Sequence, residues 1–186
     1  PTGGVVPKAT LDRLVEGLEK FPNLVILSDE IYSQMLYDGE THVSLLNYES
    51  IRDRLIVIDG WSKTYAMTGW RLGYGVWPTA LFDYAERLAV NSYSCPNAAS
   101  QHAGIAALTG PQDQVGEMLE AFDTRRKAVV EGLNQIPDIT CVMPKGAFYA
   151  FPNISATGFN ARDLQQGLLE EAGVALVAGT SFGALG

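Results

Sequence analysis

The sequence has 186 residues, of which 47% are hydrophobic and 18% are charged. This composition is typical of a globular protein with one domain, or one and a half, and it argues against disorder. The formal net charge of −8 argues against nucleic acid or an anionic membrane as a partner, and no apolar segment approaches the roughly 20 residues of a membrane span.

The first half of the chain predicts helices that alternate with strands. Apolar residues recur at helical spacing over residues 9–20, and Thr10 is the expected N-cap of this helix. Short apolar runs predict three strands at 24–27, 55–59 and 72–77, and the first two have the character of strands buried on both faces. This alternation is typical of an α/β fold with a mostly parallel sheet.

The second half is mostly helical and ends in a smaller region of mixed structure. Helical spacing predicts four helices, at residues 79–94, 98–108, 113–135 and 161–172. Asn160 is the expected N-cap of the last one. Two short strands are expected at 140–144 and 147–151, where the texture of the sequence changes. We therefore divide the chain into two domains, residues 1–130 and residues 131–186.

The cysteines and histidines indicate neither a disulfide framework nor a metal site. Cys95 and Cys141 lie far apart and form no CxxC pair, so we interpret them as buried thiols in a reducing cytoplasm. His42 and His102 have no metal-ligating partner at a suitable spacing, so we interpret them as structural or surface residues. The first residues, PTGGVVPK, lack the pattern of a signal peptide. We therefore expect a cytoplasmic protein without a metal.

Five polar residues follow two of the predicted strands. Asp29 comes just after the first run, and Tyr32 lies three residues further on. Ser62 and Lys63 follow the second run, and Arg71 lies eight positions after Lys63. Each of these residues alone is more often an ordinary surface, turn or packing residue. Ligands of parallel α/β sheets, however, bind beyond the carboxyl ends of the strands, where Asp29 and Lys63 both fall.

Taken together, these five residues suit pyridoxal phosphate. Lys63 supplies the amine for a Schiff base with the cofactor aldehyde, and Asp29 supplies a carboxylate that keeps the pyridine nitrogen protonated. Tyr32 suits the ring oxygen, while Ser62 and Arg71 offer a hydroxyl and a guanidinium fork to the phosphate. The sequence therefore predicts a cofactor site at the edge of the sheet.

The residues around the lysine allow three further interpretations. A serine–lysine hydrolase is disfavoured because adjacent side chains of an extended chain point apart, and because no S-x-x-K spacing is present. Gly69 is expected to let the chain turn back towards the phosphate. The remaining large side chains are interpreted as packing around the loop: Trp61, Tyr65, Met67 and Trp70.

The segments SDEIYSQMLYDG (28–39) and WSKTYAMTGWRLGYG (61–75) resemble the fold-type I pyridoxal-phosphate-dependent aminotransferases of class I/II, such as the aspartate, alanine and aromatic aminotransferases. PTGG at the start and PKGAFYAFPN (144–153) resemble two further motifs of this family, in the same order. The resemblance implies that residues 1–130 are the C-terminal part of a large αβα domain that binds the cofactor. Residues 131–186 would then be an incomplete α+β small domain.

The resemblance also implies a reaction and a role for each residue. Lys63 would form the internal aldimine and then move a proton between the substrate α-carbon and the cofactor. Asp29 would pair with the pyridinium, Tyr32 would contact the ring oxygen, and Ser62 and Arg71 would hold the phosphate. The reaction would be transamination between an amino acid and a 2-oxo acid, in a homodimer.

Members of this family are much longer, so the sequence looks like a fragment. It shows no counterpart of the family's asparagine before PTG, of the aromatic residue stacked on the ring, of the partner subunit's tyrosine, or of the arginine that binds the substrate carboxylate. Two alternatives stay open: a lyase of the same fold, which uses the same residues, and an inactive fragment that only folds or associates. A sheet that lacks strands exposes an edge and apolar faces, so we expect marginal stability or association.

Overall fold

The computed structural model describes residues 2–183. Contacts within the chain divide these residues into two compact units. Val5–Leu119 forms one unit, and residues 120–183 together with residues 2–4 form the other. The assignment of residues 1–130 and 131–186 to a large and a small domain stays a prediction.

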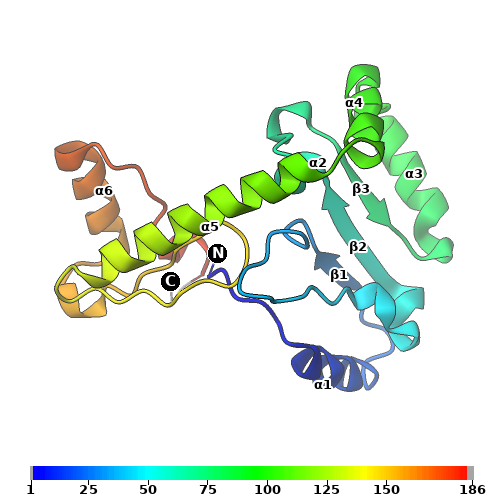
Figure 1. Cartoon of the computed structure of the whole chain (residues 1–186). Helices are drawn as coiled ribbons and strands as arrows, with labels where there is room; N and C mark the ends of the chain where they lie inside the picture. Colours follow the sequence, from blue (N-terminus) through cyan, green and yellow to red (C-terminus); the bar gives the residue numbers. More distant parts are fainter. Residues whose placement is uncertain (1, 184–186) are drawn as a thin grey trace. The chain divides into compact units, whose positions relative to one another are not determined.

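The unit Val5–Leu119 is built on a three-stranded sheet in the order β1-β2-β3 (Figure 1). β1 (Ile26–Asp29) pairs in parallel with β2 (Leu55–Gly60), whereas β3 (Gly73–Val76) runs antiparallel to β2. Parallel pairing is therefore confirmed for the first two strands and is wrong for the third. The connection from β2 to β3 holds only short helical turns, and a parallel return needs a longer crossover.

A hydrophobic core lies between α1 (Lys8–Leu18), the sheet and the connection between β1 and β2. Its buried members are Leu11, Val15, Ile26, Leu45, Ile51, Leu55 and Val57. The predicted helix is confirmed, but the predicted cap is wrong, because the N-cap is Pro7 and Thr10 lies in the first turn. The Pro7 carbonyl accepts the N–H groups of Thr10 and Leu11 at 2.9 and 3.1 Å, so the N-cap lies three residues earlier than predicted.

The two parallel strands differ in burial. In β2, Leu55, Ile56 and Val57 are all buried, as expected for a central strand. In β1, Ile26 is buried but Leu27 is 64% exposed, so the prediction of burial on both faces is wrong for β1. The reason is position, since β1 lies at the edge of the sheet and only its Ile26 side faces the core.

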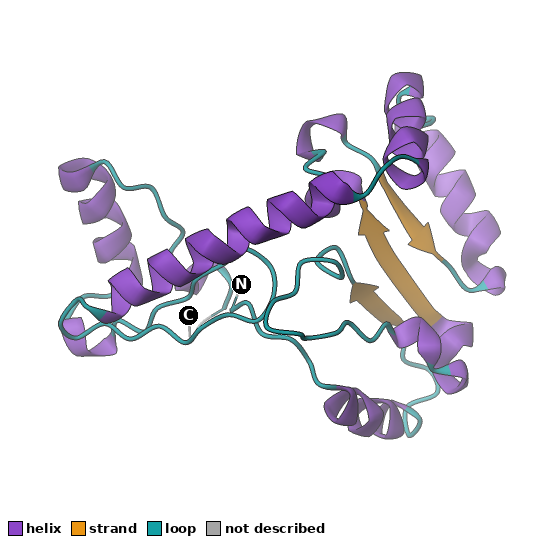
Figure 2. Ribbon diagram, in the orientation of Figure 1, coloured by secondary structure: helices purple, strands orange, loops and turns teal. Residues whose placement is uncertain are grey.

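Short helical segments connect the strands, and longer helices follow β3. Between β1 and β2 lie η1 (Leu45–Asn47) and η2 (Glu49–Arg54); between β2 and β3 lie α2 (Trp61–Thr64) and η3 (Thr68–Trp70). The predicted helices after β3 are confirmed as α3 (Thr79–Tyr93) and α4 (Ala98–Thr109), drawn in purple in Figure 2. α3, which is described in full, has no buried residue, and five of its large side chains are exposed: Phe82, Tyr84, Leu88, Val90 and Tyr93.

The other unit contains most of α5 (Asp113–Asn134), followed by η4 (Ser155–Thr157), α6 (Ala161–Ala172) and η5 (Gly179–Ser181). Both helices match the sequence prediction. The N-cap at Asn160 is confirmed, because its side-chain oxygen accepts the N–H groups of Arg162 and Asp163 at 3.1 and 2.9 Å.

The two strands predicted at 140–144 and 147–151 do not form. A single bridge pairs Thr140 with Asn153, and the backbone between them bonds elsewhere. The N–H groups of Lys145 and Gly146 donate to the Gly3 carbonyl at 2.8 and 2.9 Å. Within the first segment, the Cys141 N–H donates to Asn134 Oδ1 at 2.8 Å and the Cys141 carbonyl accepts Asn134 Nδ2 at 2.9 Å, so these groups are unavailable for a ladder between the two segments.

A buried arginine holds the same loop from α5. Arg126 donates to the Pro144 carbonyl at 2.7 Å, and its guanidinium forms an ion pair with Asp123 at 2.6 Å.

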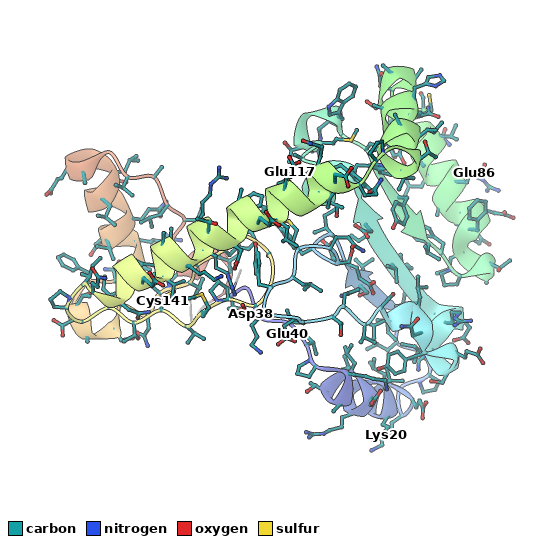
Figure 3. All side chains as sticks on the ribbon, in the orientation of Figure 1. Lys20, Asp38, Glu40, Glu86, Glu117 and Cys141 are labelled. Atoms are coloured by element: carbon teal, nitrogen blue, oxygen red, sulfur yellow. The ribbon has the colours of Figure 1, made fainter. Side chains whose placement is uncertain are left out.

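Cys141, labelled in Figure 3, is buried as predicted, whereas Cys95 is exposed and does not fit that prediction. Over residues 2–183, no helix combines the length and the apolar character needed to cross a membrane.

Candidate active site

The predicted site residues lie at the end of the parallel pair of strands. Asp29 is the last residue of β1 and is paired in register with Ile58 of β2. β2 ends two residues later, at Gly60, and α2 follows at once with Ser62 and Lys63. Because the two strands run in parallel, their carboxyl ends lie at the same edge of the sheet.

Lys63 and Tyr32 meet at this edge. The Lys63 Nζ lies 5.8 Å from the centre of the Tyr32 ring, and both residues are half-buried. Tyr32 is held in the turn after β1. In this turn the Ser33 N–H donates to the Glu30 carbonyl at 2.8 Å, and the Met35 N–H donates to the Tyr32 backbone carbonyl at 2.9 Å. Two segments that are far apart in the sequence thus bring an amine and a phenol ring together.

Arg71 takes an unusual backbone conformation. It lies in the left-handed region with φ 53° and ψ 48°, and its Nη1 donates to the Thr68 carbonyl at 3.0 Å. Gly69 lies inside the turn η3, but the positive φ angles of this segment fall at Ala66 and Arg71, so the turn does not use the conformational freedom of glycine. Such conformations cost about 1–3 kcal/mol in residues other than glycine, and they concentrate at functional sites.

A glycine lets the lysine segment approach β3. A Cβ atom on Gly60 would lie 2.8 Å from the Leu72 carbonyl oxygen and 2.9 Å from the Gly73 Cα. Both are backbone atoms, so they cannot move aside as a flexible side chain can. The close approach also lets the Trp61 N–H donate to the Leu72 carbonyl at 3.3 Å, which carries the β2–β3 pairing into the start of α2.

Glu30 organises the loop that carries Tyr32, and sequence reasoning missed it. Its buried carboxylate bonds to His42 Nε2 at 2.8 Å, and it accepts the Ser28 hydroxyl and the Leu45 N–H, each at 3.1 Å. Burial acts to raise the pKa of Glu30, but hydrogen bonds from His42, Ser44, Leu45 and Ser28 outweigh it and lower the pKa. An acidic residue directly after a buried strand was the available signal.

Asp59 forms a second polar cluster beside the lysine. Its carboxylate accepts the Gly60 N–H at 2.6 Å, the Tyr74 hydroxyl at 3.3 Å and the Ser33 hydroxyl at 3.4 Å. Burial and the neighbouring Asp59 carboxylate raise the pKa of Tyr74. The cluster links the turn after β1 to β2 and β3, so it ties the surroundings of Tyr32 to those of Lys63.

The five predicted residues offer the functional groups that pyridoxal phosphate needs. Lys63 provides an amine, Asp29 a carboxylate on an exposed strand end, and Tyr32 a phenol next to that amine. Ser62 and Arg71 provide a hydroxyl and a guanidinium on the segment that carries the lysine. This set of donors and acceptors fits the aldehyde, ring nitrogen, ring oxygen and phosphate of that cofactor.

Comparisons with known proteins identify the family of this chain. A family profile described as aminotransferase class I and II matches residues 1–186. The chain is 41% identical to an aspartate aminotransferase of Bacillus sp. strain YM-2, over 99% of this chain and 48% of the relative. It is 36% identical to an aspartate aminotransferase of Pyrococcus abyssi, over 100% of this chain and 48% of the relative.

Solved structures show the same similarity. The crystal structure of an aspartate aminotransferase from Rhizobium meliloti superposes with a TM-score of 0.92 at 36% identity, over 98% of this chain and 48% of that one. An aromatic aminotransferase from Pyrococcus horikoshii OT3 gives a TM-score of 0.94 at 36% identity, over 100% of this chain and 50% of that one. The chain thus spans about half the length of the relatives that it matches.

Proposed function

We propose that this chain, which belongs to the aminotransferase class I and II family, contributes the lysine-bearing part of a transamination site. The reaction would transfer an amino group between an amino acid and a 2-oxo acid, with pyridoxal phosphate as the cofactor. The observation that carries the proposal is the approach of Lys63 Nζ to the Tyr32 ring, at the edge where Asp29 ends β1. A phenol ring and a carboxylate near the amine suit a lysine that acts as a nucleophile.

Each residue has a distinct task in this proposal. Lys63 would hold the cofactor through its amine, and would carry the proton to and from the substrate α-carbon. The cofactor, when bound, supplies an acceptor for the electrons that the α-carbon releases. Asp29 keeps the ring nitrogen protonated, Tyr32 contacts the ring oxygen, and Ser62 and Arg71 bind the phosphate.

The proposal extends to the setting of the site. Residues 1–130 would belong to the large domain and residues 131–186 to the small domain of a homodimeric cytoplasmic enzyme. The exposed apolar side chains of α3 support association, because a free surface rarely carries so many. A lyase of the same fold would use the same five residues, so an exchange assay that depends on a 2-oxo acid separates the two reactions.

The test is to trap the cofactor. The purified chain is mixed with pyridoxal phosphate and reduced with borohydride, and the labelled peptides are mapped. The chain has five lysines, and four of them serve as internal controls: Lys8, Lys20, Lys127 and Lys145. We expect the label on Lys63, and we expect Asp29→Ala to weaken it.

The distribution of the label decides the result. Selective labelling of Lys63 supports the proposal and justifies assays with amino acids and 2-oxo acids. Equal labelling of all five lysines would contradict a formed site in this chain and would favour the inactive fragment. Lys20, which extends from the end of α1 in Figure 3, is a suitable reference for ordinary surface reactivity.

A further inference from the structure

The segment that carries Lys63 and Arg71 cannot hold its own conformation. α2 has four residues and η3 has three, which is about one turn each. Helices this short are unstable alone, because nucleation fixes several residues for very few hydrogen bonds. The left-handed backbone at Ala66 and Arg71 adds strain. Contacts from other elements must therefore set the position of the segment.

α4 contacts the lysine end of this segment through Gly104. The indole Nε1 of Trp61, two residues before Lys63, donates to the Gly104 carbonyl at 3.1 Å. A Cβ atom on Gly104 would lie 2.5 Å from Leu72 Cδ2 and 3.3 Å from Trp61 Cε2, so only glycine allows this distance without rearrangement. The Trp61 ring also meets the Tyr74 ring edge-on, with centroids 5.6 Å apart.

α4 contacts the arginine end through Ser100. The Ser100 hydroxyl donates to the carbonyl of Trp70, the residue before Arg71, at 2.8 Å. Ser100 is only 5% exposed, so the donor end of this bond is buried. Leu72, the residue after Arg71, is buried against Gly104. Arg71 is thus flanked on both sides by residues that α4 holds.

Ser100 and Gly104 are four residues apart, so they lie on the same face of α4. This face touches the reactive segment at both ends. We propose that the contacts of α4 fix the spacing between the Lys63 amine and the Arg71 guanidinium, with Ser100, Gly104 and Trp61 as positioning residues. The inference rests on the proposed function, because the spacing matters only to a ligand that engages both groups.

A fixed spacing has a measurable consequence for ligand choice. A ligand with an aldehyde and a phosphate gains from binding Lys63 and Arg71 at once, because the second contact becomes intramolecular. A ligand with the aldehyde alone gains nothing from the spacing. If α4 fixes this spacing, Lys63 should prefer pyridoxal phosphate over pyridoxal. Weakening the contacts between α4 and the segment should reduce this preference.

The first measurement compares Lys63 labelling by pyridoxal phosphate with labelling by pyridoxal, after borohydride reduction of the full chain. Trp61→Phe removes the indole donor and keeps a ring, and Ser100→Ala removes the hydroxyl. We expect each to lower the preference for the phosphate compound by about fivefold, as for one lost hydrogen bond, while labelling by pyridoxal stays unchanged. General destabilisation would lower both labels together.

The controls repeat the same chemical changes elsewhere. Trp77→Phe and Ser50→Ala alter exposed residues of the same unit that do not belong to the α4 contact. Both are expected to keep the preference of the unaltered chain. The proposed role of α4 would be overturned if Trp61→Phe and Ser100→Ala kept the preference for pyridoxal phosphate. It would also be overturned if the controls lost this preference equally.

A second measurement does not depend on the cofactor. Hydrogen exchange of the backbone amides of residues 61–71 is compared between the unaltered chain and the two variants. We expect exchange to become about fivefold faster in this segment, with no change in η2. If the unaltered chain shows no selective Lys63 label, the proposed function fails in this chain. The hydrogen-exchange result alone then decides whether α4 positions the segment.

Discussion

The loops after β1 and β2 start at neighbouring strand ends but are held in different ways. Residues 30–44 follow β1 and are organised by one buried charge, since the Glu30 carboxylate bonds to His42 and to the start of η1. Residues 61–72 follow β2 and are held by uncharged contacts from β3 and α4. The first loop is therefore organised by a charged residue of its own, whereas the second depends on uncharged contacts from elements outside it.

The backbone shows the same contrast. Positive φ angles in the first loop fall at Asp38 and Gly39, in the kind of turn where these residues are common. In the second loop they fall at Ala66 and Arg71, where a side chain makes the conformation costly. The loop that carries Lys63 thus carries strain that its surroundings must offset, which is a frequent property of functional sites.

The largest effect is expected from removing the charge of the first loop. Glu30→Ala leaves the Leu45 N–H and the His42 ring without their buried acceptor. We expect the free energy of unfolding in urea to fall by about 2–3 kcal/mol. Glu49→Ala is the matched control, because the Glu49 side chain is 88% exposed. Equal losses in the two variants would contradict the role of Glu30.

The next effect breaks the close approach in the second loop. Gly60→Ala places a Cβ atom against the backbone of Leu72 and Gly73. We expect a loss of about 1–2 kcal/mol in the free energy of unfolding, because backbone atoms must shift. In Gly17→Ala, by contrast, the new Cβ meets nothing within 4 Å, and the helix is expected to gain up to about 1 kcal/mol. A neutral Gly60→Ala would show that the contact with β3 is loose.

Acidification is expected to loosen the loop after β1 before the loop after β2. Although burial opposes it, hydrogen bonding lowers the pKa of Glu30, so its stabilising effect is complete above about pH 4.3 and is lost as pH falls through the folded-state pKa. Hydrogen exchange near residues 42–46 should therefore quicken on acidification before that of residues 61–71. Glu30→Gln should abolish this order. Simultaneous loosening of both loops would contradict the contrast.

The smallest effect concerns the link between the loops. Tyr74→Phe removes the hydroxyl that donates to Asp59 at 3.3 Å, a long bond on a partly exposed ring. We expect a change of about 0.5 kcal/mol in the free energy of unfolding, measured in urea. Tyr84→Phe, on a ring that is 69% exposed, should change nothing. A loss above about 2 kcal/mol for Tyr74→Phe would assign the Asp59 cluster a larger part than its geometry supports.

Local patterns in the sequence predicted the helices, the two parallel strands and the cap at Asn160. They also predicted that Asp29 and Lys63 follow strand ends. These features depend on residues a few positions apart, because helical spacing, strand runs and caps involve neighbours along the chain. The lysine motif was readable for the same reason, since its residues lie within a single short segment.

Tertiary contacts decided the rest. β3 is antiparallel because of the short return from β2, and the segments near residues 140–151 do not form a ladder because both backbone groups of Cys141 bond to the Asn134 side chain. Glu30, Ser100 and Gly104 gained their parts from partners 12 to 43 positions away. No local pattern encodes such contacts, because they exist only when the fold brings distant segments together. The residues of the proposed site could therefore be named from the sequence, whereas the elements that hold them in place appeared only in the folded chain.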